Sequence, residues 1–297
     1  MIIPALALLH NRAFSWTEFA VYPSFLVGWL AFGGVYVLLV GPLRHHFPGS
    51  QPVPRSMLAS FATGMAIMFL ALQGPLHDLS DYFLFSAHMV QHLLLILLMP
   101  PFLLAGIPDW MLRPAIKIRP IGSVASILTF PVVAFALNNG IFAAWHVPGA
   151  YDLMMRNHDV HVAMHLMIMA TGFIMWWPIM SPLPELPRLS APLQMVYLFV
   201  LGIPMMVVAA MITYSGTVLY TWYEEAPRIW GIATLTDQQL GGAIMWVPGG
   251  LSLWLSITYV YFRWAGGEMR EDEQRQRLRV SGARRVMATV PPPFPER

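Results

Sequence analysis

The sequence predicts an all-α membrane protein, a polytopic bundle of about seven transmembrane helices. Apolar residues make up 57% of the 297 residues and charged residues only 11%, whereas a soluble protein carries about 25% charged residues. Several long apolar stretches each have roughly 20 residues, the length that crosses the ~30 Å hydrocarbon core as a helix. Prolines cluster between these stretches, as in Pro182, Pro184 and Pro187, which is typical of loops.

The expected spans follow one another along the chain with shorter, more polar loops between them. They lie at about 20–41, 56–73, 83–105, 121–139, 158–179, 192–214 and 240–263, so the transmembrane domain is expected to cover 20–263. Residues 1–19 lack the basic start and the cleavage site of a signal peptide, and we expect an interfacial segment there. Residues 264–297 are polar and rich in arginine. We expect them to form a cytoplasmic tail, with a short helix and then a disordered, proline-rich end.

Basic residues predict how the bundle is oriented in the membrane. Of the 17 Lys and Arg residues, only Arg12, Arg156 and Arg228 fall outside the tail and the first, third and fifth loops. Because short loops rich in Lys and Arg stay on the cytoplasmic side, the pattern predicts an external N-terminus and a cytoplasmic C-terminus.

Composition also limits the classes of function. The net charge of +2 is too small to indicate a nucleic-acid partner, and no nucleic-acid motif is present. The chain has no cysteine, which excludes disulfides and thiolate metal ligands. No serine nucleophile constellation and no nucleotide loop is recognisable, so the expected surroundings are membrane lipid and other membrane proteins.

Two histidine pairs lie within the apolar stretches, His88 with His92 and His161 with His165. A spacing of four residues places both imidazoles of a pair on one helix face, within reach of one metal ion. Titratable side chains are costly inside a membrane and usually mark function there. The predicted topology puts both pairs in the outer half of the bundle, so we predict a metal site between the two helices. A purely structural polar cluster is the alternative.

Other polar and thioether side chains fall near the same face of the membrane. His146 is a further candidate metal ligand. Possible supporting or additional ligands are His77, His158, Asp78, Asp237, Gln238, Met99 and Met169. Asp237 opens the last span, where it is either the N-cap of its own helix or an acceptor that orients a ligating imidazole.

The ligand types leave several metals open. Imidazole and thioether without thiolate suits copper, but imidazole also binds zinc and iron, and paired histidines bind haem. The main rival to a copper-binding protein is a zinc-dependent or di-iron intramembrane enzyme, with Asp78, Asp81 or Asp237 as general base.

Three motifs carry a family resemblance. The first runs from His88-Met-Val-Gln-His92 into Met99-Pro-Pro-Phe-Leu-Leu-Ala-Gly106. The second joins Trp145-His-Val-Pro148 to His161-x3-His165 and Trp176-Trp-Pro178. The third is Asp237-Gln-Gln-Leu-Gly-Gly, which continues to Gly249. In this order they resemble the polytopic CtaG-type cytochrome c oxidase assembly factors.

The resemblance implies a multi-pass protein of the bacterial inner membrane that helps to assemble a haem–copper cytochrome c oxidase. It implies copper supply or insertion, with the oxidase catalytic subunit or its assembly intermediates as partner, and no catalytic residue. The family's motif positions fall on His88, His92, His146, His161, His165 and Asp237. His77 and His158 do not fall on them. On this hypothesis, the imidazoles hold a copper ion from the periplasm and pass it to the oxidase by ligand exchange.

Overall fold

The protein is a bundle of helices that are mostly apolar. The structure, a computed structural model, describes residues 14–17 and 21–289. Within this part every regular element is helical and none is a strand. Among the described residues, six helices are long and apolar enough to cross a membrane, or up to seven if a bent pair counts as one span. This confirms the predicted all-α fold with about seven spans. Apart from residues 14–17, the expected interfacial segment lies outside the described residues, as does the proline-rich end.

The elements follow one another in this order: α2 (Pro23–Val40), η1 (Arg44–His46), α3 (Arg55–Leu72), α4 (Pro75–Tyr82), α5 (Phe85–Leu93), η2 (Leu94–Leu98), α6 (Met99–Gly106), α7 (Asp109–Ile116), α8 (Arg119–Leu128), α9 (Pro131–Trp145), α10 (Pro148–Arg156), α11 (His158–Met180), α12 (Ala191–Thr213), α13 (Trp222–Glu225), α14 (Thr234–Ile244), η3 (Met245–Gly249) and α15 (Gly250–Thr289). The turn η1 is a 3₁₀-helix, and η2 and η3 are π-helical turns within longer spans. Such turns are frequent at functional sites.

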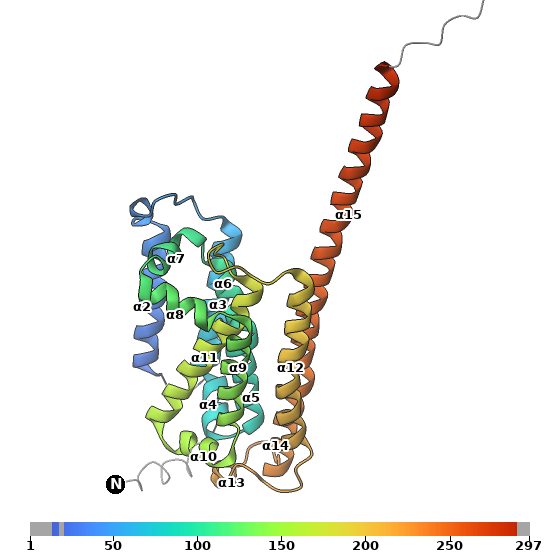
Figure 1. The fold of residues 1–297 in the computed structure, drawn as a ribbon. Helices are drawn as coiled ribbons and strands as arrows, with labels where there is room; N and C mark the ends of the chain where they lie inside the picture. Colours follow the sequence, from blue (N-terminus) through green and yellow to red (C-terminus); the bar gives the residue numbers. More distant parts are fainter. Residues whose placement is uncertain (1–13, 18–20, 290–297) are drawn as a thin grey trace, which may run out of the picture.

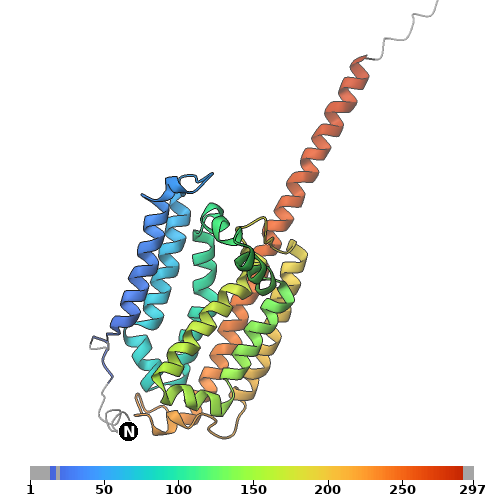
Figure 2. The ribbon, with the colours of Figure 1, turned by 60° about the vertical axis from the view of Figure 1, so that its left-hand side comes forward.

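The bundle has two distinct ends. Figure 1 shows α10 and α13 together at one end, which we call the site end, and α15 leaving the bundle at the other, the tail end. The same arrangement is visible from the side in Figure 2. The predicted orientation would place the site end outside the cytoplasm.

The fourth span differs from its predicted bounds of 121–139. The chain bends by 71° between α8 and α9, so the helix that lines the bundle interior is Pro131–Trp145. Pro131 has no N–H to donate and disfavours helical backbone at the residue before it. Phe130 is accordingly extended, with φ −62° and ψ 128°.

The last helix is much longer than the predicted span of 240–263. It begins with α14 at Thr234 and continues through η3 into α15, which reaches Thr289 without a break. Charged residues such as Glu268 and Arg270 follow Trp264, and both residue types favour helix. The chain therefore becomes polar after Trp264, but the helix continues. The result is the long helix that projects beyond the bundle in both views (Figures 1 and 2).

Glycines allow the helices around the site to approach closely. A Cβ on Gly64 would lie 2.6 Å from the Leu103 side chain, so α3 and α6 are in direct contact. Gly241 of α14 lies against the ring of Phe85 at the start of α5. Small residues at such points let helices pack tightly within a membrane. The histidine-bearing helix α5 is therefore held between α14 and its neighbours.

Candidate metal centre

The two histidine pairs meet inside the bundle. His88 and His92 lie one turn apart on α5, with ring centroids 4.2 Å apart, and His161 and His165 lie one turn apart on α11, at 4.6 Å. Across the two helices, His88 is 5.5 Å from His161 and His92 is 5.7 Å from His165. The structure thus brings together the four imidazoles that the sequence spacing singled out.

Ring nitrogens of this cluster have no protein partner. The four histidine residues are at most 7% exposed. Both ring nitrogens of His88 lack a hydrogen bond, as does Nε2 of His92, His161 and His165, among the residues that the structure describes. A buried polar atom left without a partner costs about 1–3 kcal/mol. Several unpartnered ring nitrogens in one buried cluster have the chemistry of a ligand set for a transition metal.

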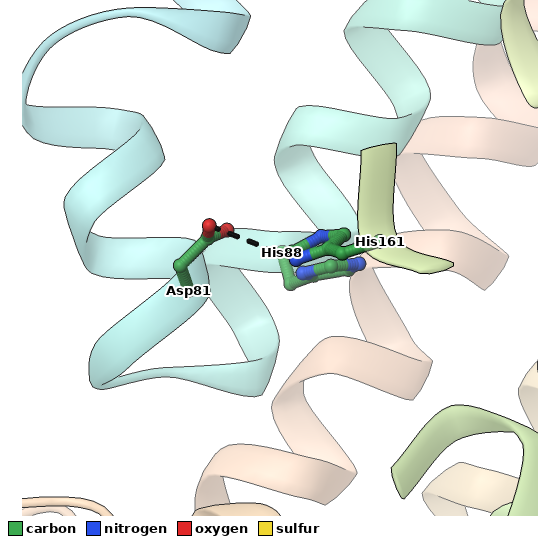
Figure 3. A group of neighbouring side chains, drawn as sticks. All are labelled: Asp81, His88 and His161. Carbon is green, nitrogen blue, oxygen red and sulfur yellow. Dashed lines mark ion pairs between the residues drawn. The ribbon is translucent and has the colours of Figure 1, made fainter. Parts of the chain in front are cut away.

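Asp81 adds a carboxylate to the cluster. One ligand atom each of Asp81, His88 and His161 lies within 4.8 Å of the others, an arrangement drawn in Figure 3. The carboxylate is 3.7 Å from Nδ1 of His161. The sequence analysis considered Asp81 only as a general base. The missed signal is its position four residues after His77, which places both side chains on one face of α4.

His77 contacts the Asp81 carboxylate from one turn earlier on α4. Its Nε2 lies 3.4 Å from Asp81 Oδ2, and its Nδ1 accepts a hydrogen bond of 2.9 Å from the side-chain amide of Gln91. With Nδ1 an acceptor, the proton sits on Nε2 and points to Asp81, which is the usual way a ligating carboxylate is oriented. Asp78 is buried on the same helix, and its carboxylate is outside the group of potential ligand atoms.

The structure gives Asp237 a role that differs from both sequence alternatives. Its carboxylate accepts hydrogen bonds from the backbone N–H groups of Phe85, at 2.7 Å, and Ser86, at 3.2 Å. The Ser86 hydroxyl donates to it as well. Asp237 therefore caps the N-terminus of α5. Among the described residues, it neither caps its own helix nor bonds an imidazole.

Gln238 bonds the backbone of Thr217 and Leu219 and so fixes the loop before α13.

His146 directly follows α9 and lines a small cavity together with His92. Its Nδ1 is 2.7 Å from the carbonyl oxygen of Phe142, so Nδ1 carries the proton and Nε2 carries the lone pair. That Nε2 has no partner among the described residues. Burial lowers the pKa of His146 to about 4, against the opposing effect of the Phe142 hydrogen bond. The imidazole is therefore neutral at physiological pH, as a metal ligand must be.

Two cavities flank the cluster. A groove of about 520 Å³ runs between α2 and α11, and its polar wall holds His77, Asp81, His158, His161 and His165. The exposed His158 and the half-buried Met169 line this groove.

The second, inner cavity has a volume of about 40 Å³ and is lined by His92 and His146. Met99 is wholly buried in the apolar core and lines neither space.

Three tyrosines, Tyr151, Tyr220 and Tyr223, lie at the site end. Tyr151 lies 5.5 Å from the His88 ring, and its hydroxyl is 3.1 Å from that of Tyr223. Tyr223 in turn donates to the carbonyl of Ser80, and Tyr220 donates to the carbonyl of His146. The run Tyr220-Thr-Trp-Tyr223 in the segment between α12 and α14 is the signal for two of these tyrosines, but the local sequence does not indicate that this segment folds toward the bundle interior.

Comparisons with known proteins identify three mycobacterial relatives. The chain is 26% identical over 244 residues to uncharacterized proteins of Mycobacterium bovis and Mycobacterium tuberculosis, a match that covers 77% of this chain and 36% of each relative. An uncharacterized protein of Mycobacterium leprae is 25% identical over 234 residues, covering 73% of this chain and 35% of the relative. The chain thus spans about a third of the length of these relatives. No solved structure gives a significant match.

A family model provides the assignment. The model of the cytochrome c oxidase caa3 assembly factors matches residues 34–266, which include α3, α5, α11 and α14 and therefore every histidine of the cluster. The predicted resemblance is thereby confirmed, and the chain belongs to the cytochrome c oxidase caa3 assembly factor family.

Proposed function

We propose that this protein binds copper at the buried histidine cluster and supplies it during assembly of a haem–copper cytochrome c oxidase. The observation that carries the proposal is the cluster of four buried imidazoles whose ring nitrogens lack protein partners among the described residues. A family of oxidase assembly factors supplies the context, and copper is a metal that such an oxidase must receive. Imidazole ligands without thiolate are compatible with copper.

The two flanking cavities suggest how the ion enters. The groove beside α11 reaches Asp81, His161 and His165, so a cation from the outer side meets a carboxylate and imidazoles first. His88 and His92 then complete its coordination within the bundle. Release occurs by ligand exchange to the oxidase catalytic subunit or an assembly intermediate, docked beside the bundle in the bacterial inner membrane. The lipid bilayer aligns the two proteins.

A zinc-dependent intramembrane hydrolase is less well supported. Such an enzyme needs a carboxylate free to act as general base. Asp237, one of the three candidates, has both oxygens bonded to the N-terminus of α5. Asp81 is held by His77 and lies where a ligand would sit.

Metal analysis of the purified protein tests the proposal. The detergent-solubilised full chain, saturated with copper and desalted, should retain about one or more copper ions per chain when measured by plasma mass spectrometry. Alanine at both His92 and His165 should abolish stoichiometric copper, because it removes one ligand from each helix. The control is alanine at His45 and His46, which are exposed at the tail end, and it should retain full loading. Copper retained in the first variant would refute the site. Zinc or iron retained in preference to copper would instead favour an enzyme, and a Soret absorption band would reveal haem.

A further inference from the structure

The cavity beyond His92 has an unusual lining. It holds about 40 Å³ of space, enough for a small number of water-sized groups. Its walls carry two imidazoles and four thioethers, from His92, His146, Met89, Met175, Met205 and Met245. The methionines come from α5, α11, α12 and η3 and are at most 8% exposed. Met99 and Met169, the thioether candidates on the predicted histidine faces, do not line this cavity, whereas Met89 directly follows His88 in the sequence.

Both imidazoles that line this cavity have a ring nitrogen without a hydrogen-bond partner. Nε2 of His92 and Nε2 of His146 are buried and lack a partner among the described residues. The hydrogen bond from Nδ1 of His146 to Phe142 fixes the tautomer that leaves Nε2 basic. Methionine packing alone explains the thioethers, but it does not explain two unpartnered imidazole nitrogens beside them.

The electrostatics of the cavity select the charge of the ion. None of its lining residues is acidic, whereas the groove on the other side of the cluster contains Asp81. The cost of placing an ion in a medium of low dielectric is large, and it rises with the square of the ionic charge. A neutral cavity therefore favours a monovalent ion, and thioether with imidazole is a ligand set that favours Cu(I).

A continuous series of imidazoles joins the two spaces. His165 lines the groove and His92 lines the cavity, and their ring centroids are 5.7 Å apart. His88 is within 4.2 Å of His92 and 5.5 Å of His161. An ion can therefore pass from one space to the other by exchanging one imidazole at a time.

We propose that His92, His146 and the four cavity methionines form a second, inner site that holds Cu(I), fed from the outer cluster. This inference rests on the proposed copper cargo and adds the oxidation state and the destination of the ion within the protein. The ion keeps its charge throughout, and only its ligands change.

X-ray absorption spectroscopy of the Cu(I)-loaded full chain tests the inner site. The protein is loaded without oxygen from a chromogenic Cu(I) chelator, which also reports affinity by competition. The wild type should show sulfur scattering at copper. Leucine at all four cavity methionines is close in volume. It should remove that scattering and weaken Cu(I) binding about tenfold or more, a loss of ~1.4 kcal/mol. Alanine at His146 should also weaken Cu(I) binding.

The controls separate this inference from the proposed function. Leucine at Met99 and Met154, both wholly buried away from the cavities, should leave scattering and affinity unchanged. Copper bound by nitrogen and oxygen alone in the wild type would overturn the inner site while keeping copper binding. Sulfur scattering that persists in the quadruple leucine variant would also overturn it. A wild type that binds no copper would overturn both proposals.

Discussion

Replacing Asp237 by alanine tests whether this carboxylate holds the helix that carries His88 and His92. Asp237 is 0% exposed and accepts from the N–H groups of Phe85 and Ser86 and from the Ser86 hydroxyl. Alanine leaves two buried backbone donors without an acceptor, while the hydroxyl can rotate to another. At about 1–3 kcal/mol for each donor, the expected loss is about 4 kcal/mol of unfolding free energy.

Asp152 provides a matched control at the same end of the bundle. It also accepts from two backbone N–H groups and one hydroxyl, those of Thr221 and Trp222. These bonds lie near the surface, so water can replace the carboxylate. Alanine at Asp152 should therefore cost only about 1 kcal/mol, the usual value for a lost cap.

Thermal unfolding in detergent, followed by tryptophan fluorescence, compares the two variants with the wild type. The Tm of the Asp237→Ala protein should fall several times further than that of Asp152→Ala. Copper affinity measured well below both transitions should also fall in the Asp237 variant, because α5 is no longer fixed at its start. Equal shifts in Tm would refute the assignment of Asp237 as a buried cap.

Two further predictions concern the ligand set and the scaffold. Asparagine at Asp81 removes the only carboxylate of the potential ligand group. It should weaken metal binding about 10–100-fold in a competition titration, and an unchanged affinity would exclude Asp81 from the site. Alanine at Gly64 places a Cβ 2.6 Å from Leu103 and should cost about 1–3 kcal/mol. Alanine at Gly140, which meets open space, should be neutral or stabilise α9 by up to ~1 kcal/mol. Similar Tm values for the two alanine variants would contradict the close contact of α3 and α6.

The sequence predicted best what depends on local periodicity. The spans at 158–179 and 192–214 agree with α11 and α12 to within a residue, because hydropathy and helix length are local properties. The i, i+4 spacing also predicted that each histidine pair shares one helix face. The bend before α9 was missed because the apolar run continues through Pro131, and composition alone does not locate the break.

What the sequence could not supply is the pairing of distant elements. Asp81 approaches His161 across 80 positions of the chain. His146 shares a cavity with His92 only because α9 packs against α11 and α12. The cavity methionines come from four separate segments, and apart from Met89, which directly follows His88, none of them stands out from the 21 in the chain. Their grouping is a property of helix packing, which periodicity along one helix does not contain.

The third family motif acts on the site from a distance. Asp237 and Gly241 are one turn apart on α14, and both meet Phe85 at the start of α5. The carboxylate bonds the Phe85 backbone, and the glycine leaves room for the Phe85 ring. Neither residue is among the potential ligands. Asp237 fixes the position of the start of α5 along α14, and Gly241 fixes the distance between the two helices. These two residues therefore determine where His88 and His92 face α11. Asp237 and Gly241 of this motif therefore position the histidine ligands and do not themselves bind the metal.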